Sequence, residues 1–112
     1  MYEYRAELLK VVDGDTCDMR IDVGFAMTTV QRCRLLRINA PEMKGDTREA
    51  GERSKSYLES LLKQGPLVIR TEKDDAFGRY LAEILVEQSD GIAVNVNQAM
   101  LDSGHSVEYS RR

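Results

Sequence analysis

The sequence predicts an α+β fold that is mainly β, a closed five-stranded barrel of the OB type with two or three α-helices. Two observations carry this prediction. Five short segments have strand patterns, and a helical pattern separates the third from the fourth while another follows the fifth. The chain has 112 residues, which fits one domain, residues 1–112, built around a single small core.

The first three strands are predicted from alternation and turn residues. Residues 2–12 alternate with one change of phase, which indicates a strand with a β-bulge. Residues 15–23 alternate cleanly and stop at Gly24, and a loop leads to a third strand over residues 30–38. Pro41 cannot donate to a sheet and restricts the residue before it, so this strand ends near residue 39.

The remaining elements follow from capping and turn signals. Asp46 and Glu49 stand at the spacing of a capping box, which predicts that a helix begins at Asp46 and ends before Gly65-Pro66. The same reasoning gives two further strands and a second helix, which begin at Leu67, Leu81 and Asn95. The tail that follows is polar, and we expect His105 to be exposed and to take no part in function.

Composition limits the class of protein. The net charge of −3 argues against a broad basic surface for nucleic acid, although Arg32, Arg34 and Arg37 form a local basic group. No apolar run approaches the roughly 20 residues of a membrane span. The N-terminal residues lack the pattern of a signal peptide, so we expect a cytoplasmic monomer that does not bind membranes. A processed secreted form is the alternative.

Two cysteines, Cys17 and Cys33, are too few for a disulfide scaffold and are not spaced as zinc ligands. If the second and third strands form a hairpin, the two lie nearly opposite each other. In a reducing compartment we expect two small buried apolar residues and no disulfide.

Polar turns at the ends of apolar runs predict one site assembled from strand ends. They are the segments 13–16, 34–42 and 77–79. Carboxylate, amide and carbonyl oxygens suit a hard cation such as Ca²⁺, and the candidate ligands are Asp15, Asn39 and the carbonyl of Ala40. Asp13 is a candidate partner of these ligands.

The other charged residues of these turns suit a phosphodiester substrate. Guanidinium groups hold a phosphate through two hydrogen bonds and neutralise charge that grows on its oxygens, which makes Arg34 and Arg79 candidate catalytic residues. The carboxylate of Glu42 can accept a proton from an attacking water. Each residue also has a plain structural interpretation: Asp13 to Asp15 as a turn, Glu42 as a solvated loop residue, and Arg34 as the ion-pair partner of Asp15 or Glu42.

Four motifs together resemble those of the staphylococcal-nuclease-like (thermonuclease) family, in the same order and over almost the whole chain. They are Val12 to Thr16, Arg34 to Glu42, Phe77 to Ala82 and Val94 to Met100. The resemblance implies an OB-type barrel and a calcium-dependent endonuclease that cuts DNA and RNA, prefers single strands and leaves 3′-phosphates.

The resemblance also implies residue roles. Asp15 and the Ala40 carbonyl correspond to metal ligands, Asp13 to a nearby acid, and Arg34 and Arg79 to phosphate-binding arginines. Glu42 corresponds to the carboxylate that acts on the attacking water. Phe77 and Tyr109 are expected to contact the substrate.

This chain departs from the pattern of the family in two places that matter. Asn39 replaces a metal carboxylate, which removes one negative charge and is expected to weaken binding of the ion or to relax the choice of ion. Phe77 replaces an aromatic residue that carries a hydroxyl, so stacking is retained and one hydrogen bond is lost. The alternative function is a non-catalytic nucleic-acid-binding or interaction module of the same fold.

Overall fold

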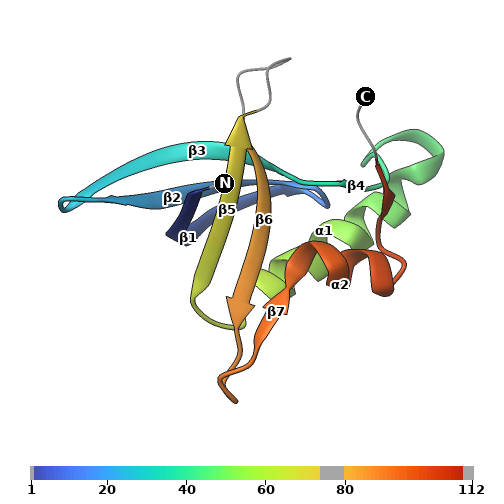
Figure 1. The fold of residues 1–112 in the computed structure, drawn as a ribbon. Helices are drawn as coiled ribbons and strands as arrows, with labels where there is room; N and C mark the ends of the chain where they lie inside the picture. Colours follow the sequence, from blue (N-terminus) through green and yellow to red (C-terminus); the bar gives the residue numbers. More distant parts are fainter. Residues whose placement is uncertain (1, 74–79, 110–112) are drawn as a thin grey trace.

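Five strands close into a barrel in the computed structural model, which describes residues 2–73 and 80–109 (Figure 1). Neighbouring strands pair antiparallel in the order β3-β2-β1-β5-β6, and a parallel pairing of β3 with β6 closes the barrel. This confirms the predicted fold class. The five strands are β1 (Tyr2–Asp13), β2 (Thr16–Gly24), β3 (Met27–Leu35), β5 (Leu67–Lys73) and β6 (Tyr80–Glu87).

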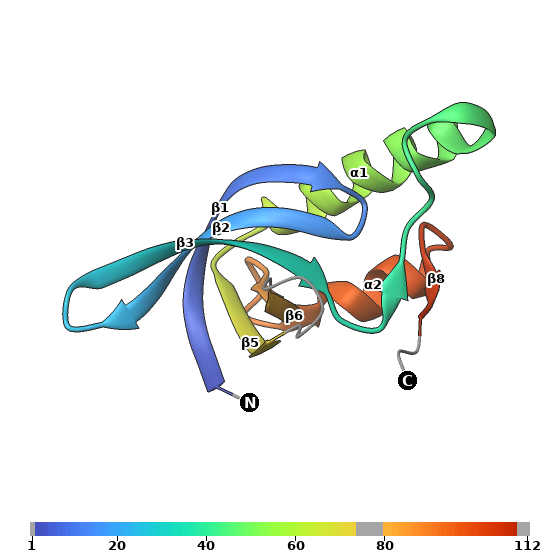
Figure 2. The ribbon, with the colours of Figure 1, turned by 90° about the horizontal axis from the view of Figure 1, so that it is seen from above.

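Two α-helices lie on the same side of the barrel, and the β2–β3 hairpin projects from the other side (Figures 1 and 2). Within the described residues, neither helix has the length and apolar character needed to cross a membrane. The elements outside the barrel are β4 (Ile38–Asn39), the 3₁₀ helix η1 (Gly45–Thr47), α1 (Arg48–Leu62), β7 (Ala93–Asn95), α2 (Val96–Asp102) and β8 (Val107–Glu108).

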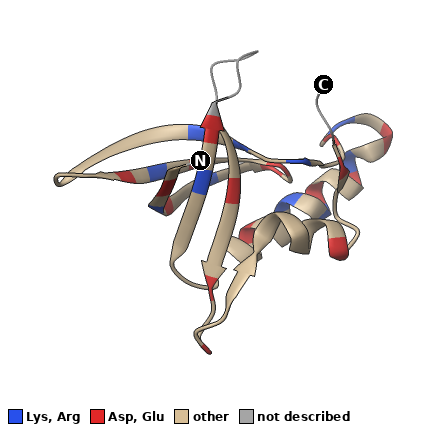
Figure 3. Ribbon diagram, viewed as in Figure 1, with Lys and Arg blue, Asp and Glu red and all other residues tan. Residues whose placement is uncertain are grey.

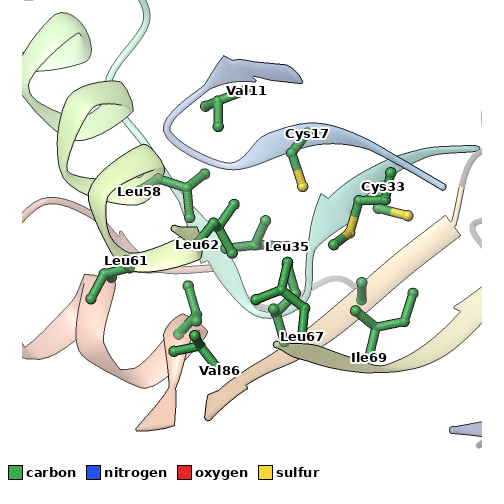
Figure 4. Packing of buried hydrophobic residues seen from close by; sticks show 14 of the residues in the cluster. Val11, Cys17, Cys33, Leu35, Leu58, Leu61, Leu62, Leu67, Ile69 and Val86 are labelled. Carbon is green, nitrogen blue, oxygen red and sulfur yellow. The ribbon is translucent and has the colours of Figure 1, made fainter. Parts of the chain in front are cut away.

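The core lies between the inner faces of the strands and the apolar side of α1 (Figure 4). Cys17 and Cys33 face each other across β2 and β3, and both are free and fully buried. Burial raises the pKa of the Cys33 thiol to about 11 and raises that of Cys17 further. Both therefore remain thiols at neutral pH and pack as small apolar groups, as the sequence predicted.

The third strand differs from its prediction at both ends. The expected loop from Gly24 to residue 29 is a two-residue turn, Phe25-Ala26, so β3 begins at Met27. The strand also ends three residues early, at Leu35, because Arg37 adopts a left-handed conformation with a φ of 66°.

Hydrogen bonds fix this early end. The amide of Leu36 donates to the carbonyl of Ala82 over 2.9 Å. The buried side chain of Asn97 donates to the carbonyls of Leu36 and Ala82 and accepts from the amide of Ile84. This one side chain therefore joins α2 to the end of β3 and to β6. It gives hydrogen-bond partners to the carbonyl of Leu36 and the amide of Ile84, and it is a second donor to the carbonyl of Ala82.

The helix ends were predicted with mixed success. The capping box at Asp46 is wrong, because α1 begins at Arg48 and its N-cap residue, Thr47, makes no capping hydrogen bond. The Thr47 hydroxyl instead donates to the carbonyl of Glu42 over 2.7 Å. For α2, the side chain of Asn95 accepts from the amide of Gln98, so this predicted start is confirmed.

The polar tail contains structure that the sequence did not predict. Strand β8 pairs with β4, which places the end of the described chain beside residues 38–39. His105 is half-buried and not exposed as expected: its ring stacks on Tyr57, with centroids 4.2 Å apart and an interplanar angle of 7°.

Two glycines let loops approach α1 closely. A Cβ atom on Gly14 would lie 2.0 Å from the hydroxyl of Ser54 and 2.7 Å from the Cβ of Ala40. A Cβ atom on Gly51 would lie 2.6 Å from the carbonyl oxygen of Glu42. Small residues at these positions therefore set the distance from the helix to the 13–15 turn and to the 40–42 segment.

We expect Gly14→Ala to lower the free energy of unfolding by about 1–3 kcal/mol, because the added methyl overpacks the contact with α1. Urea denaturation measures this loss. In a double-mutant cycle, Ser54→Gly removes the nearest atoms and should recover at least about 0.5 kcal/mol of it. Strictly additive effects of the two substitutions would show that Gly14 does not press on Ser54.

Candidate active site

The carboxylate of Asp15 joins β2, β3 and the residue that follows β4, at one end of the β2–β3 hairpin. One of its oxygens accepts from the hydroxyl of Thr16 over 2.9 Å, and the other accepts from the amide of Ala40 over 2.9 Å. The second oxygen also lies 3.6 Å from a guanidinium nitrogen of Arg34. The register of β2 and β3 places Thr16 opposite Arg34, which is why these groups meet.

Arg34 is held on several sides and only 12% of its side chain is exposed. Its Nη2 atom donates to the Oδ1 atom of Asn39 over 2.9 Å, and its Nη1 atom donates to the carbonyl of Ile38 over 3.3 Å. Its guanidinium lies 5.2 Å from the ring centroid of Tyr109, within cation–π range. The sequence predicted a partly buried arginine with an anionic partner, and the structure shows Asp15 in that place.

Asp13 and Asp15 influence each other. The Oδ1 atom of Asp13 accepts from the amide of Asp15 over 3.1 Å. Burial raises the pKa of Asp13, and its hydrogen bond to the Asp15 side chain adds to the shift. Burial also opposes ionisation of Asp15, but hydrogen bonds from Asp13 and Ala40 and the charge of Arg34 outweigh it and lower its pKa. Asp15 is therefore the more acidic of the two carboxyl groups.

Glu42 stands apart from this cluster. Its side chain is 74% exposed, and its carboxylate lies 3.9 Å from the ammonium of Lys44. Its backbone is fixed by the hydroxyl of Thr47 and by the close approach of Gly51. The other two predicted site residues, Phe77 and Arg79, lie outside the described residues.

Two contributors to the cluster were missed or left unexplained by sequence reasoning. Thr16 directly follows the predicted ligand Asp15. This position in the sequence is the signal that could have identified its hydroxyl as a hydrogen-bond donor to the Asp15 carboxylate. Tyr109 was expected to contact substrate only through the resemblance. The structure places it by pairing β8 with β4 and by a 2.8 Å hydrogen bond from its amide to the carbonyl of Arg37.

The donors near Asp15 suit a hard cation in type. Each Asp15 oxygen accepts one of the hydrogen bonds above, and a carboxylate oxygen has two acceptor sites. Asn39 and the carbonyl of Ala40 add neutral oxygens. In residues 2–73 and 80–109, no three His, Cys, Asp or Glu side chains are grouped to hold a metal ion.

A family model described as staphylococcal nuclease homologue matches residues 32–112 of this chain. The chain belongs to the staphylococcal nuclease homologue family. The match includes Arg34, Asn39, Ala40 and Glu42 and begins after Asp13 and Asp15. Membership supports a nuclease-type or nucleic-acid-interacting function and agrees with the resemblance drawn from the four motifs.

Two curated relatives match most of this chain. Protein ParB of Escherichia coli is 29% identical over 111 residues, which cover 96% of this chain and 58% of that protein. An uncharacterized protein of Methanocaldococcus jannaschii is 28% identical over 129 residues, which cover 95% of this chain and 59% of that protein. The chain thus spans less than two thirds of the length of either relative.

The pH dependence of stability tests the role of Asp15 in the fold. Because its folded pKa lies below the unfolded value, Asp15 stabilises the fold above about pH 4, and this contribution is lost as the pH falls through the folded pKa. We expect Asp15→Asn to lower the free energy of unfolding by about 2 kcal/mol at pH 7 and by much less near pH 3.

Urea denaturation at the two pH values measures the difference. Asp46→Asn, which changes an exposed carboxylate, is the control and should have little effect at either pH. An equal loss at both pH values would mean that the charge of Asp15 does not stabilise the fold.

Proposed function

We propose that this chain is a calcium-dependent endonuclease that hydrolyses phosphodiester bonds of DNA and RNA, prefers single strands and leaves 3′-phosphates. The observation that carries the proposal is the placement of Arg34. Its guanidinium is almost buried, fixed by Asn39 and Ile38, and next to the ionised Asp15. Family membership makes phosphodiester chemistry the natural use of this arrangement.

In this proposal Arg34 binds the phosphate and stabilises charge on its oxygens as a water attacks. A guanidinium has five N–H donors, which allows it to keep its protein contacts while it donates to a phosphate. The contacts to Asn39 and Ile38 fix its orientation before substrate binds, so little reorganisation is needed. Arg79, by resemblance, supplies a second guanidinium.

Asp15, Asn39 and the carbonyl of Ala40 are the groups that would hold Ca²⁺, with Asp13 beside them. A divalent ion held there would polarise a phosphoryl oxygen and help to orient water. The neutral Asn39 makes this a weaker calcium site than one with two carboxylates, so other divalent ions are possible cofactors. The exposed carboxylate of Glu42 can accept the proton of the attacking water, and Tyr109 and Phe77 contact the substrate.

The second candidate is a non-catalytic module that binds nucleic acid. Two features of the described residues favour it. Asn39 supplies no charge to a metal, and Glu42 contacts Lys44, with no hydrogen bond or ion pair to Arg34 or Asp15. Cleavage of a single-stranded oligonucleotide with calcium, and its loss on adding a chelator, decides between the two functions. Binding without cleavage in any divalent ion would leave the binding module.

We expect Arg34→Ala to lower the cleavage rate by about 100- to 1,000-fold, as the loss of one charge-stabilising group does elsewhere. Initial rates on single-stranded DNA with calcium measure this, and a urea curve checks that the variant is folded. Arg48→Ala, which removes an exposed arginine of α1, is the control and should keep the parent rate. Full activity of Arg34→Ala would remove Arg34 from the catalytic residues.

Asn39→Asp should tighten calcium binding by at least about tenfold, because it adds a negative charge beside Asp15. Calorimetric titration of the protein with calcium measures the affinity directly, without an activity assay. Asn95→Asp adds the same charge at the N-cap of α2 and should leave the affinity unchanged. Weaker binding by Asn39→Asp would show that Asn39 does not face the ion.

A further inference from the structure

The tip of the β2–β3 hairpin carries an unusual apolar group. Phe25 is 98% exposed, Met27 61% and Val30 58%. The tip projects well beyond the barrel on the side away from the helices (Figures 1 and 2). Residues 23–31 contain no charged side chain, although 31% of the whole chain is charged, and Figure 3 shows this part of the ribbon without charge.

The turn at this tip is also strained. Phe25 and Ala26 have φ values of 55° and 59°, the left-handed conformation at both central positions of a type I′ turn. Such turns strongly prefer Asn-Gly, because residues with larger side chains destabilise the left-handed region. Phe25 therefore has an unfavourable backbone conformation, and its apolar ring is exposed to solvent. A partner that contacts the ring would account for both.

The hairpin connects this tip to the candidate active site. Pairing in register places Arg34, Arg32 and Val30 of β3 on one face, with Arg20 opposite Val30. Arg32 and Arg20 form ion pairs with Asp18 and Glu7. Arg20 is 44% exposed and binds one oxygen of Glu7 over 3.2 Å, and such an exposed pair contributes little to stability. Arg32 is 55% exposed but binds both oxygens of Asp18, over 2.8 and 3.1 Å, which is a stronger pair. The guanidinium of Arg20 can therefore exchange carboxylate for phosphate at little cost, and Arg32 has further N–H donors for a phosphate while it keeps Asp18.

We propose that this face of the hairpin binds the single-stranded substrate beyond the cleavage site, with Arg32 and Arg20 contacting phosphates and Phe25 stacking on a base. The proposal rests on the nuclease function above and adds a binding site to it. An aromatic ring stacks on any base, so Phe25 contributes affinity without sequence preference. The uncharged tip suits the faces of bases, and the arginines nearer the site suit the backbone.

The length of the hairpin sets the length of nucleic acid that is needed. At about 3.3 Å per residue, the run from residue 25 to residue 34 spans about 30 Å. A strand with the stacked spacing of about 3.4 Å per nucleotide covers this distance in about nine nucleotides, and a more extended strand covers it in fewer. A short oligonucleotide bound at Arg34 should therefore not reach Phe25.

The test measures fluorescence anisotropy of labelled oligodeoxythymidines of about 20 and about four nucleotides, lengths on either side of that reach, with a chelator present to prevent cleavage. Phe25→Leu keeps apolar bulk but removes the ring, and Phe25→Tyr keeps the ring. A third variant, Phe25→Asn with Ala26→Gly, removes the ring and relaxes the turn. Ile92→Ala removes an apolar residue that is 62% exposed in the loop between β6 and β7, and it serves as the control.

We expect Phe25→Leu and the relaxed double variant to bind the long strand about tenfold more weakly, as loss of one stacked base does, and to bind the short one as the parent does. Phe25→Tyr and Ile92→Ala should match the parent. The double variant should also resist more urea than the parent, so its weaker binding would not come from unfolding.

Salt dependence separates the role of the arginine from that of the aromatic ring. Arg32→Gln should reduce the slope of log affinity against log salt by about one, and Phe25→Leu should leave this slope unchanged.

Unchanged affinity of Phe25→Leu for the long strand overturns the proposal, as does a parent that binds no single strand. If the affinity is unchanged and sedimentation shows that Phe25→Leu dissociates an oligomer, the tip contacts a second copy of the chain instead. The outcome does not depend on whether the protein cleaves DNA, because fluorescence anisotropy with a chelator present measures binding alone. Absent cleavage with Phe25-dependent binding would contradict the nuclease function and support the binding face.

Discussion

The candidate site depends on the close contact between the 13–15 turn and helix α1. There is no space for a side chain between Gly14 and Ser54, so the turn packs directly on the helix. The same helix supports the segment after β4 through Gly51. Two loops that are distant in sequence are thus held at fixed positions on one rigid element, and Asp15 joins them through its hydrogen bond to the amide of Ala40. Precise placement of this kind is what a catalytic or phosphate-binding site needs.

The ion pair of Asp15 and Arg34 has a structural use and, in the proposed function, a chemical one. It is partly buried, so loss of either partner leaves a charge without compensation. The same burial excludes water and strengthens the field that a phosphate would meet. Asp15 is therefore the residue whose structural role and proposed metal-binding role are hardest to separate by substitution. Measurements at several pH values and of metal binding separate them better than activity does.

The sequence predicted the barrel well because its strand patterns and turns are local signals. Alternation in β2, the Gly65-Pro66 stop and the Asn95 cap each act within a few residues. The features that it missed depend on distant partners. The early end of β3 requires Asn97, more than sixty residues away by sequence number, to bind the carbonyl of Leu36. The position of Tyr109 requires a two-residue pairing of β8 with β4, which leaves no pattern in so short a segment.

Asn39 shows how the site balances charge in this chain. Its neutral side chain accepts from Arg34, so the guanidinium is oriented without a second ion pair. A carboxylate at this position would hold calcium more tightly, but it would also attract Arg34 more strongly and compete with the phosphate for it. In the proposed site, an amide would therefore leave more of the charge of Arg34 for an anionic ligand and would bind a metal ion more weakly. If the proposed site is correct, its composition would favour phosphate binding over metal binding, which fits both candidate functions.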